Sequence, residues 1–493
     1  VNRVARTYLL PSNRTLARFI PTTEPKRAEI PVAPSAASLV DGYTGRAAVA
    51  AGEAFDPTPA NIQARTDSFV LGDGLRVSLL PKKTRGEMAT ATLVFRFGDE
   101  AAITGRTDAA GYAGSLLMRG SKTLNREQID KRFDDLKASV GVDGGAQNAY
   151  ITVTTKRAHL AEALALAADV LRNPAFPDTE FEQLREQSIT SMEASRREPG
   201  RYVSEAMGKH FNHWPAGHPL AFRTLDENLA ATRAVKLEDV RAFHRDFYGT
   251  ATGEVAVVGD FDPVQMKQQL QELFTGWKST RPFARIADSH RPVAAIRESF
   301  ETPDKANAVL LARSEFPLNS NDPDYPALSI ANRVFGGGGM ASRLGDRIRQ
   351  KDGLSYGVGS QIGVPDRDDN ATFLIQASAA PENMTRLEAA MREELDRFVR
   401  EGITAAELAD AKDGLLTQMA NARASDGTVA SILRSNLYLD RTMQWTADNE
   451  AAIRALTVEQ VNAAIKRHIR PESLSVFVAG DFAGAARKAG ETK

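Results

Sequence analysis

The chain has 493 residues, 42% hydrophobic and 25% charged, which is normal for a soluble globular protein and suggests two to four domains. Lys and Arg number 62 against 63 Asp and Glu, so a net charge of −1 leaves no global basic field for nucleic acid or an anionic membrane. No stretch approaches the roughly 18 apolar residues that span a bilayer, and the absence of cysteine excludes disulfides, thiol nucleophiles and Cys-ligated metals.

The amino terminus resembles a segment near the carboxyl terminus. Residues 1–11 read VNRVARTYLLP and residues 461–471 read VNAAIKRHIRP, with Val-Asn first and Pro eleventh in both. Residues 16–21, LARFIP, then predict a closing strand. We therefore expect residues 1–21 to be the last helix and strand of a preceding domain; an ordinary amphipathic leader is the alternative. Since no Met and no charged-then-apolar leader begins the sequence, we expect any export signal to have been removed or to lie elsewhere.

Residues 22–60 are rich in Pro, Ala and small polar residues and predict an extended linker. Residues 70–81 then contain two strand runs around an Asp-Gly turn. Further on, residues 149–155 alternate as a strand, a helix follows, and a second helix opens near Thr179 after a break at residues 173–174. The stripe of that first helix consists of Leu160, Leu164, Ala167 and Leu171.

The same order recurs downstream. A strand at 371–376 precedes a helix, and residues 404–407 (TAAE) form a capping-box start for the next helix. The apolar stripe of the first of these helices consists of Leu387, Met391, Leu395 and Phe398.

Both units also end in a helix and a strand, at 240–261 and 461–482, and the offsets agree: 461 − 240 = 221 and 371 − 149 = 222. The pattern predicts two homologous domains, at 61–285 and 286–493.

Five segments, taken in order and spacing, resemble the M16 metallopeptidases (pitrilysin and mitochondrial processing peptidase) from about residue 65 to 485. They are 73–77 (DGLRV), 218–229, 240–261, 335–344 (FGGGGMASRL) and 353–357 (GLSYG). The resemblance implies an α+β fold, with each domain a mainly antiparallel sheet backed by helices, and two such halves closing around a substrate chamber. One half of such enzymes carries His-x-x-Glu-His and a distant Glu, which leave a zinc coordination site open for water.

The zinc motif is degenerate in this chain. Its flanks align with residues 108–121 (DAAGYAGSLLMRGS), which places Gly111 and Ser115 at the two His positions and Gly114 at the general base. Glu193 lies near the expected third ligand, and a lone carboxylate does not hold zinc. We therefore expect no metal site in this chain.

A second histidine cluster consists of His210, His213 and His218. The first two could share a helix face, but residues 214–215 (WP) end the helix and no acid has metal spacing. A surface or packing role is favoured for these histidines.

Arg349 and Tyr356 match the Arg and Tyr that the half without zinc contributes in active M16 enzymes. Gly353 is predicted to end the helix with Arg349 and to start the strand with Tyr356, so that both side chains point into one cleft. A phenol is a neutral donor at pH 7 and could stabilise an oxyanion, while the Arg fork could hold a carbonyl or carboxylate. Without the resemblance, a solvated Arg and a packing Tyr would be the simpler interpretation.

Four glycines, Gly336, Gly337, Gly338 and Gly339, predict a loop at the chamber wall where backbone can approach substrate. A phosphate loop is excluded because MASRL follows instead of Gly-Lys-Ser/Thr.

Together these features predict the zinc-less half of a metalloendopeptidase that hydrolyses peptides, inactive without a zinc-bearing half. That half is either a separate chain or a cleaved upstream part. The alternative from another class is a catalytically inactive scaffold or a peptide-binding subunit. We expect a soluble, periplasmic bacterial protein with no nucleic-acid partner and no membrane span.

Overall fold

A computed structural model describes residues 2–17, 50–72, 74–250 and 252–491 of the chain. Two compact units emerge from the contacts, Val1–Val49 and Ala50–Lys493. The described part of the first unit contains α1 (Asn2–Tyr8) and a 3₁₀ turn, η1 (Pro11–Asn13). The predicted strand at 16–21 lies mostly, and the predicted linker up to residue 49 wholly, outside the described residues.

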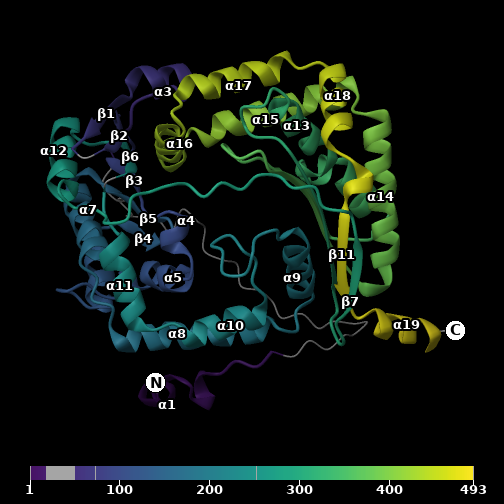
Figure 1. Ribbon diagram of the computed structural model, residues 1–493, viewed down its shortest axis with the longest axis horizontal. Coiled ribbons are helices and arrows are strands. Elements are labelled where there is room, and N and C mark those ends of the chain that lie inside the picture. Colours follow the sequence, from purple (N-terminus) through teal and green to yellow (C-terminus); the bar gives the residue numbers. More distant parts are fainter. Residues whose placement is uncertain (1, 18–49, 73, 251, 492–493) are drawn as a thin grey trace, which may run out of the picture. The chain divides into compact units, whose positions relative to one another are not determined.

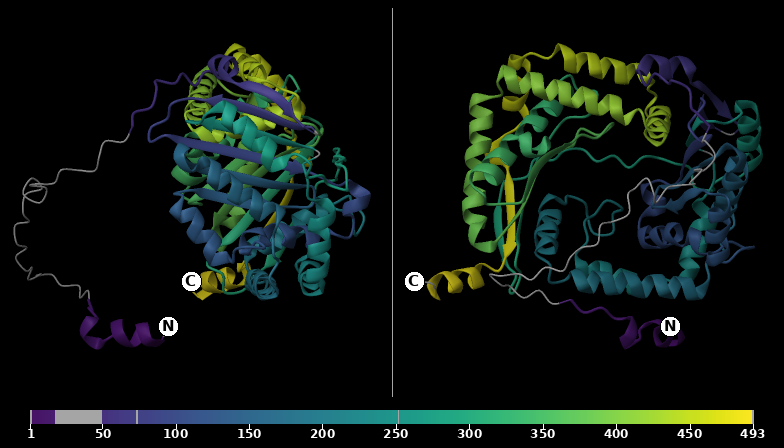
Figure 2. Two further views of the ribbon diagram at one scale, coloured as in Figure 1. Left: turned by 90° about the vertical axis from the view of Figure 1, so that its left-hand side faces the viewer. Right: turned by 180° about the vertical axis from the view of Figure 1, so that it is seen from behind.

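The second unit begins its first half with a six-stranded sheet of order β1-β2-β6-β3-β5-β4 (Figures 1 and 2). All neighbours are antiparallel except β2 and β6. The strands are β1 (Asp67–Leu71), β2 (Leu75–Pro81), β3 (Met88–Arg96), β4 (Ser139–Gly144), β5 (Asn148–Lys156) and β6 (Gly253–Gly259). The hairpin of β1 and β2 confirms the predicted turn, whose Asp73 lies outside the described residues.

Helices complete this half of the unit. They are α3 (Pro59–Arg65), α4 (Glu100–Ile103), α5 (Thr107–Leu116), α6 (Arg126–Asp135), α7 (Arg157–Arg172), α8 (Asp178–Ser195), α9 (Pro199–Phe211), α10 (Leu225–Ala234), α11 (Leu237–Phe247) and α12 (Pro263–Phe274), with a 3₁₀ turn η2 (Leu117–Arg119). The predicted stripe of α7 is fully buried, and the inward residues of β5 face it, so the alternating and helical patterns meet in one core.

The second half repeats the arrangement with a five-stranded sheet, β7-β11-β8-β10-β9, in which only β7 and β11 are parallel. Its strands are β7 (Arg297–Glu301), β8 (Ala308–Phe316), β9 (Gly357–Gly363), β10 (Ala371–Ala379) and β11 (Ser475–Gly480). Its regular helices are α13 (Tyr325–Asn332), α14 (Met384–Glu401), α15 (Ala405–Ala422), α16 (Asp426–Leu439), α17 (Met443–Ala455), α18 (Val458–His468) and α19 (Phe482–Glu491). The predicted α+β fold with two similar, mainly antiparallel sheets is therefore confirmed, as is the capping box of Thr404 and Glu407.

One helix of each half packs on the sheet of the other half. α16 packs on β6 and β3 of the first sheet, while α9 packs on β11 and β8 of the second (Figure 1). Buried Val429 and Leu433 of α16 share a cluster with Val258, and Val203 of α9 shares one with Phe477. This exchange binds the two halves into one unit.

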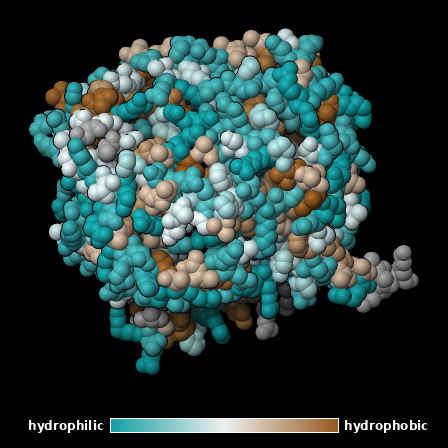
Figure 3. All heavy atoms as spheres, in the orientation of Figure 1, coloured by the Kyte–Doolittle hydropathy of each residue, from teal (hydrophilic) through white to brown (hydrophobic). Residues whose placement is uncertain are grey.

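The face seen in Figure 3 is mostly hydrophilic, with apolar residues in small groups. Across residues 2–17, 50–72, 74–250 and 252–491, no helix combines the length and the apolar character needed to cross a membrane.

Candidate functional site

The predicted site residues lie in an unusual helical segment between α13 and β9. A π-helix, η3 (Arg333–Gly337), continues α13, a 3₁₀ turn, η4 (Gly339–Ala341), follows, and a second π-helix, η5 (Gly345–Lys351), leads to β9. The predicted loop is therefore wrong for Gly336 and Gly337, which lie in the wider π form of the helix, whereas Gly338 lies in a turn and Gly339 begins the 3₁₀ turn. π-Helical turns are rare and occur frequently at functional sites.

The four glycines occupy their positions for different structural reasons. Gly336 is buried, and a Cβ there would lie 2.6 Å from the backbone nitrogen of Ser360 in β9, so close packing of helix and strand excludes a side chain. Gly337 and Gly338 would contact their own preceding turn, at 2.5 and 2.6 Å. Gly339 has a left-handed φ of +65° with open space around it. Gly337 and Gly339 are the exposed members of the run.

Arg349 and Tyr356 lie in contact, although not in a cleft as predicted. The Arg349 guanidinium carbon lies 4.5 Å from the centroid of the Tyr356 ring, a cation–π contact. Gly353, with φ of +61°, turns the chain between them, and the Leu354 nitrogen donates to the Ile348 carbonyl at 2.9 Å. Tyr356 stands one residue before β9 rather than in it, so the predicted strand position was wrong by one residue.

Ser355 fixes this turn and was not singled out from the sequence. Its side chain is buried, its hydroxyl donates to the Ser378 carbonyl at 2.6 Å, and it accepts from the Gly357 nitrogen at 3.0 Å. A small hydroxyl residue directly before Tyr-Gly is the sequence signal that could have revealed it.

The three arginines of this segment have separate partners. Arg343 binds Glu407 and the Gly402 carbonyl and is largely buried, which makes it a packing residue. Arg347 pairs with Asp352 and Glu393. Within the described residues no carboxylate pairs with Arg349, so its fork is available to a ligand.

The Tyr356 side chain is 85% exposed, and Met340 beside this segment is 57% exposed. Several cavities of about 290 to 750 Å³ lie elsewhere among the described residues, and neither Arg349 nor Tyr356 lines these cavities. One of them, about 630 Å³ beside α9, is lined by charges of both signs, including Arg201 and Glu205. The pair therefore forms an open surface that only a second surface could close.

The degenerate zinc motif lies on α5. Gly111 and Ser115 are exposed one turn apart, while Gly114 is buried against β4: a Cβ on Gly114 would lie 2.1 Å from the Gly144 carbonyl oxygen. The zinc that M16 enzymes bind does not fit here, since Gly111 has no ligand side chain, Ser115 offers a neutral hydroxyl in place of an imidazole, and the general-base position Gly114 has no room for a side chain. No group of three possible metal-binding side chains occurs among the described residues.

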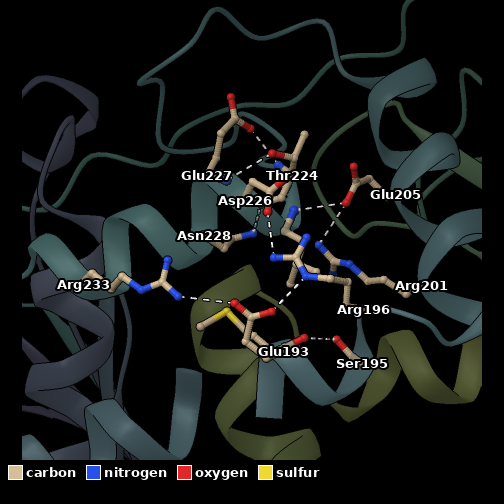
Figure 4. A network of polar contacts seen from close by, with 12 residues as sticks. Glu193, Ser195, Arg196, Arg201, Glu205, Thr224, Asp226, Glu227, Asn228 and Arg233 are labelled. Carbon is tan, nitrogen blue, oxygen red and sulfur yellow. Dashed lines mark hydrogen bonds and ion pairs between the residues drawn. The ribbon is translucent and has the colours of Figure 1, made fainter. Parts of the chain in front are cut away.

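Glu193 is engaged in a surface network at the end of α8 (Figure 4). Its carboxylate pairs with Arg196 at 2.8 Å and with Arg233 at 3.3 Å, and Arg196 also contacts Asp226. The Arg196 hydrogen bond is the main reason that the pKa of Glu193 lies below its ordinary value. This carboxylate thus has arginine partners in place of a metal.

The histidine cluster has the predicted packing role. α9 ends at Phe211, as residues 214–215 implied. His210 contacts the Ser475 hydroxyl at 2.9 Å, His213 lies 3.2 Å from Asp288, and His218 stacks on Trp214 at 3.9 Å.

The fold defines a class of protein: two similar α+β halves, each with a mainly antiparallel sheet, with an Arg–Tyr contact at the start of β9 in the second half. Residues 234–415 match the family described as peptidase M16 inactive domain. Over these residues the chain is similar to the peptidase M16 family.

Related sequences and solved structures point to the same family. The chain is 25% identical over 329 residues to an uncharacterized zinc protease of Rickettsia bellii, covering 63% of this chain and 72% of that protein. It is 21% identical over 393 residues, 78% and 87% of the two chains, to the non-peptidase homolog YmxG of Helicobacter pylori.

Among solved structures, the peptidase M16 inactive domain from Pseudomonas fluorescens superposes with a TM-score of 0.74 at 23% identity, over 84% of this chain and 97% of the other. The periplasmic protease PqqL from Escherichia coli superposes with a TM-score of 0.70 at 16% identity, over 97% of this chain and 51% of PqqL. At these identities the likeness is one of fold.

Proposed function

We propose that this chain is the zinc-less half of an M16-type metalloendopeptidase and that it contributes Arg349 and Tyr356 to a peptide-hydrolysing chamber. The observation that carries the proposal is the Arg–Tyr contact itself. A fully buried contact would be a packing feature, whereas here Tyr356 is exposed and no carboxylate among the described residues pairs with the half-buried Arg349. Such donors stabilise a developing charge best where water is excluded, so the pair calls for a covering partner.

Peptide hydrolysis places negative charge on the scissile carbonyl oxygen when water adds to it. In the closed assembly the Tyr356 hydroxyl donates a hydrogen bond to that oxygen, and the cation–π contact with Arg349 holds the ring in place. Arg349 binds a neighbouring substrate carbonyl or a terminal carboxylate with its planar fork. A zinc ion bound by the partner half would supply the activated water.

The glycine run contributes to substrate binding at its exposed members. Gly337 and Gly339 leave their backbone accessible, and no side chain stands between them and an extended peptide. Gly336 serves helix–strand packing instead, because Ser360 fills the space that a side chain would need.

The test is the turnover of a quenched fluorescent peptide by this chain in complex with a zinc-bearing M16 half. Tyr356→Phe should lower kcat about 10²- to 10³-fold, the cost of one oxyanion donor, and leave the melting temperature unchanged because the hydroxyl is exposed. Tyr202→Phe on α9, away from the pair, is the matched control. An unchanged kcat for Tyr356→Phe would remove its catalytic role.

A scaffold or peptide-binding subunit is the second candidate. It is favoured by the match to a family described as inactive and by the non-peptidase homolog among the relatives. On that account the native complex contains no zinc and cleaves no peptide, and substitutions at Arg349 change only peptide affinity.

A further inference from the structure

The described amino-terminal residues repeat the end of the last domain in their local structure. α1 ends at Tyr8 and η1 spans Pro11–Asn13. α18 ends at His468 and the 3₁₀ turn η7 spans Pro471–Ser473. The offsets are identical, since 468 − 8, 471 − 11 and 473 − 13 all equal 460. Helix, link and turn thus have the same spacing in both places.

Side-chain character follows the same register. In the last domain Ala464, Ile465 and Ile469 are at most 2% exposed, and Val476 in β11 is fully buried. Their counterparts at an offset of 460 are all apolar: Val4, Ala5, Leu9 and Leu16.

These counterparts are not buried. Val4 is 48% exposed, Leu9 81% and Leu16 70%, and no residue from 2 to 17 is buried. A seven-residue helix has little stability by itself in water, because most helical stability comes from packing an apolar face. α1 therefore has an apolar face like that of a buried helix, but this face is not buried against other described residues.

The superposition on PqqL is consistent with an element that continues an earlier domain. It covers 97% of this chain. The same superposition uses only 51% of PqqL. The inactive-domain structure from Pseudomonas fluorescens, by contrast, accounts for 84% of this chain with 97% of its own length.

We propose that residues 2–17 are the closing helix and turn of a third M16-type domain and dock into the partner half that supplies the rest of it. The surface that receives them is defined by what α18 contacts here, namely counterparts of α13 and α14 beside the central strand of a sheet. Leu9 enters that core as Ile469 enters the core of the last domain. The zinc-bearing nature of the partner rests on the proposed function, whereas the docking requires only the M16-type domain.

The test is site-specific photocrosslinking of the full chain in its native host. The photoreactive residue p-benzoylphenylalanine replaces Leu9 in one variant and Arg6, whose counterpart Lys466 is exposed, in a control. The expected result is an adduct from position 9, absent from position 6, whose partner peptide lies in the core of an M16-type domain outside residues 50–493. A mass increase on a denaturing gel shows that the crosslinked partner is a separate chain. An adduct without a mass increase shows that the crosslinked residues lie upstream in the same polypeptide.

The proposal is overturned if position 9 links to residues 50–493 of this chain or forms no more adduct than position 6. Leu9→Asp should abolish co-purification of the same M16-type domain, whereas Arg6→Asp should preserve it. Residues 2–17 lie outside the unit that starts at Ala50, so neither change threatens the folding of that unit.

Failure of the docking and failure of the proposed function give different results. A position-9 adduct in a zinc-free complex that cleaves nothing supports the docking and contradicts the peptidase role. A zinc-dependent peptidase that survives Leu9→Asp intact contradicts the docking and leaves the peptidase role standing.

Discussion

Two glycines on α5 provide the sharpest test of how the zinc motif was lost. A Cβ on Gly111 meets no heavy atom within 4 Å, whereas a Cβ on Gly114 would lie 2.1 Å from the carbonyl oxygen and 2.4 Å from the nitrogen of Gly144 in β4. Gly111→Ala and Gly114→Ala place the same methyl group in the interior of one helix. Only the second collides with the backbone of a neighbouring strand.

The expected difference in the free energy of unfolding follows from comparing the two substitutions. Each gains about 0.5–1 kcal/mol from replacing a helix-interior Gly by Ala. That gain cancels in the comparison, so the difference between the variants is the overpacking cost, about 1–3 kcal/mol for a methyl group forced into filled space. We expect Gly111→Ala to be more stable than the parent and Gly114→Ala to be less stable.

The assay is urea unfolding of the full chain, followed by circular dichroism. The reasoning is refuted if Gly114→Ala unfolds at the same or a higher urea concentration than Gly111→Ala. If the prediction holds, reinstating a zinc motif through Gly114→Glu must also displace β4, so three substitutions cannot restore the metal site.

Two further predictions concern stability. Arg423 and Glu450 form a pair with side chains only 5% and 7% exposed, and Glu450 also pairs with the more exposed Arg454. Arg423→Ala should therefore cost up to about 3 kcal/mol in urea unfolding, because the buried carboxylate keeps only one arginine partner. The exposed pair of Arg400 supplies the control, and Arg400→Ala should change stability by less than about 1 kcal/mol. Burial lowers the pKa of His244 from 6.5 to about 4, so the unfolded chain takes up this proton at higher pH than the folded one. Its contribution, about 3 kcal/mol from 2.5 pKa units, is complete above pH 6.5 and is lost as the pH falls through 4. His244→Gln should therefore lose less stability than the parent between pH 7 and pH 4, and an equal loss would contradict the assignment.

Local patterns predicted much of the fold because burial acts on them directly. The helix ends at Phe247 and His468 keep the 221-residue offset read from the sequence, and the stripe of α7 is buried as its spacing predicts. The exchange of α9 and α16 could not be predicted in this way, because an apolar helix face does not specify which sheet covers it.

The candidate site was predictable in identity and less so in geometry. The resemblance to M16 enzymes, rather than spacing alone, singled out Arg349 and Tyr356, and the structure places the guanidinium over the ring. The π-helical turns were missed because they keep the composition of an ordinary helix or loop, and Gly336 is explained by Ser360, a partner 24 residues away (360 − 336) that only the folded chain brings near. Glu193 likewise pairs with Arg233, which no local pattern connects to it.

The measurement that tests the central claim most directly is peptide cleavage and metal content of the native complex that contains this chain. The account predicts stoichiometric zinc bound to the partner half and cleavage that disappears when this chain is removed or carries Tyr356→Phe. A zinc-free complex, or a partner that cleaves equally well without this chain, would contradict it.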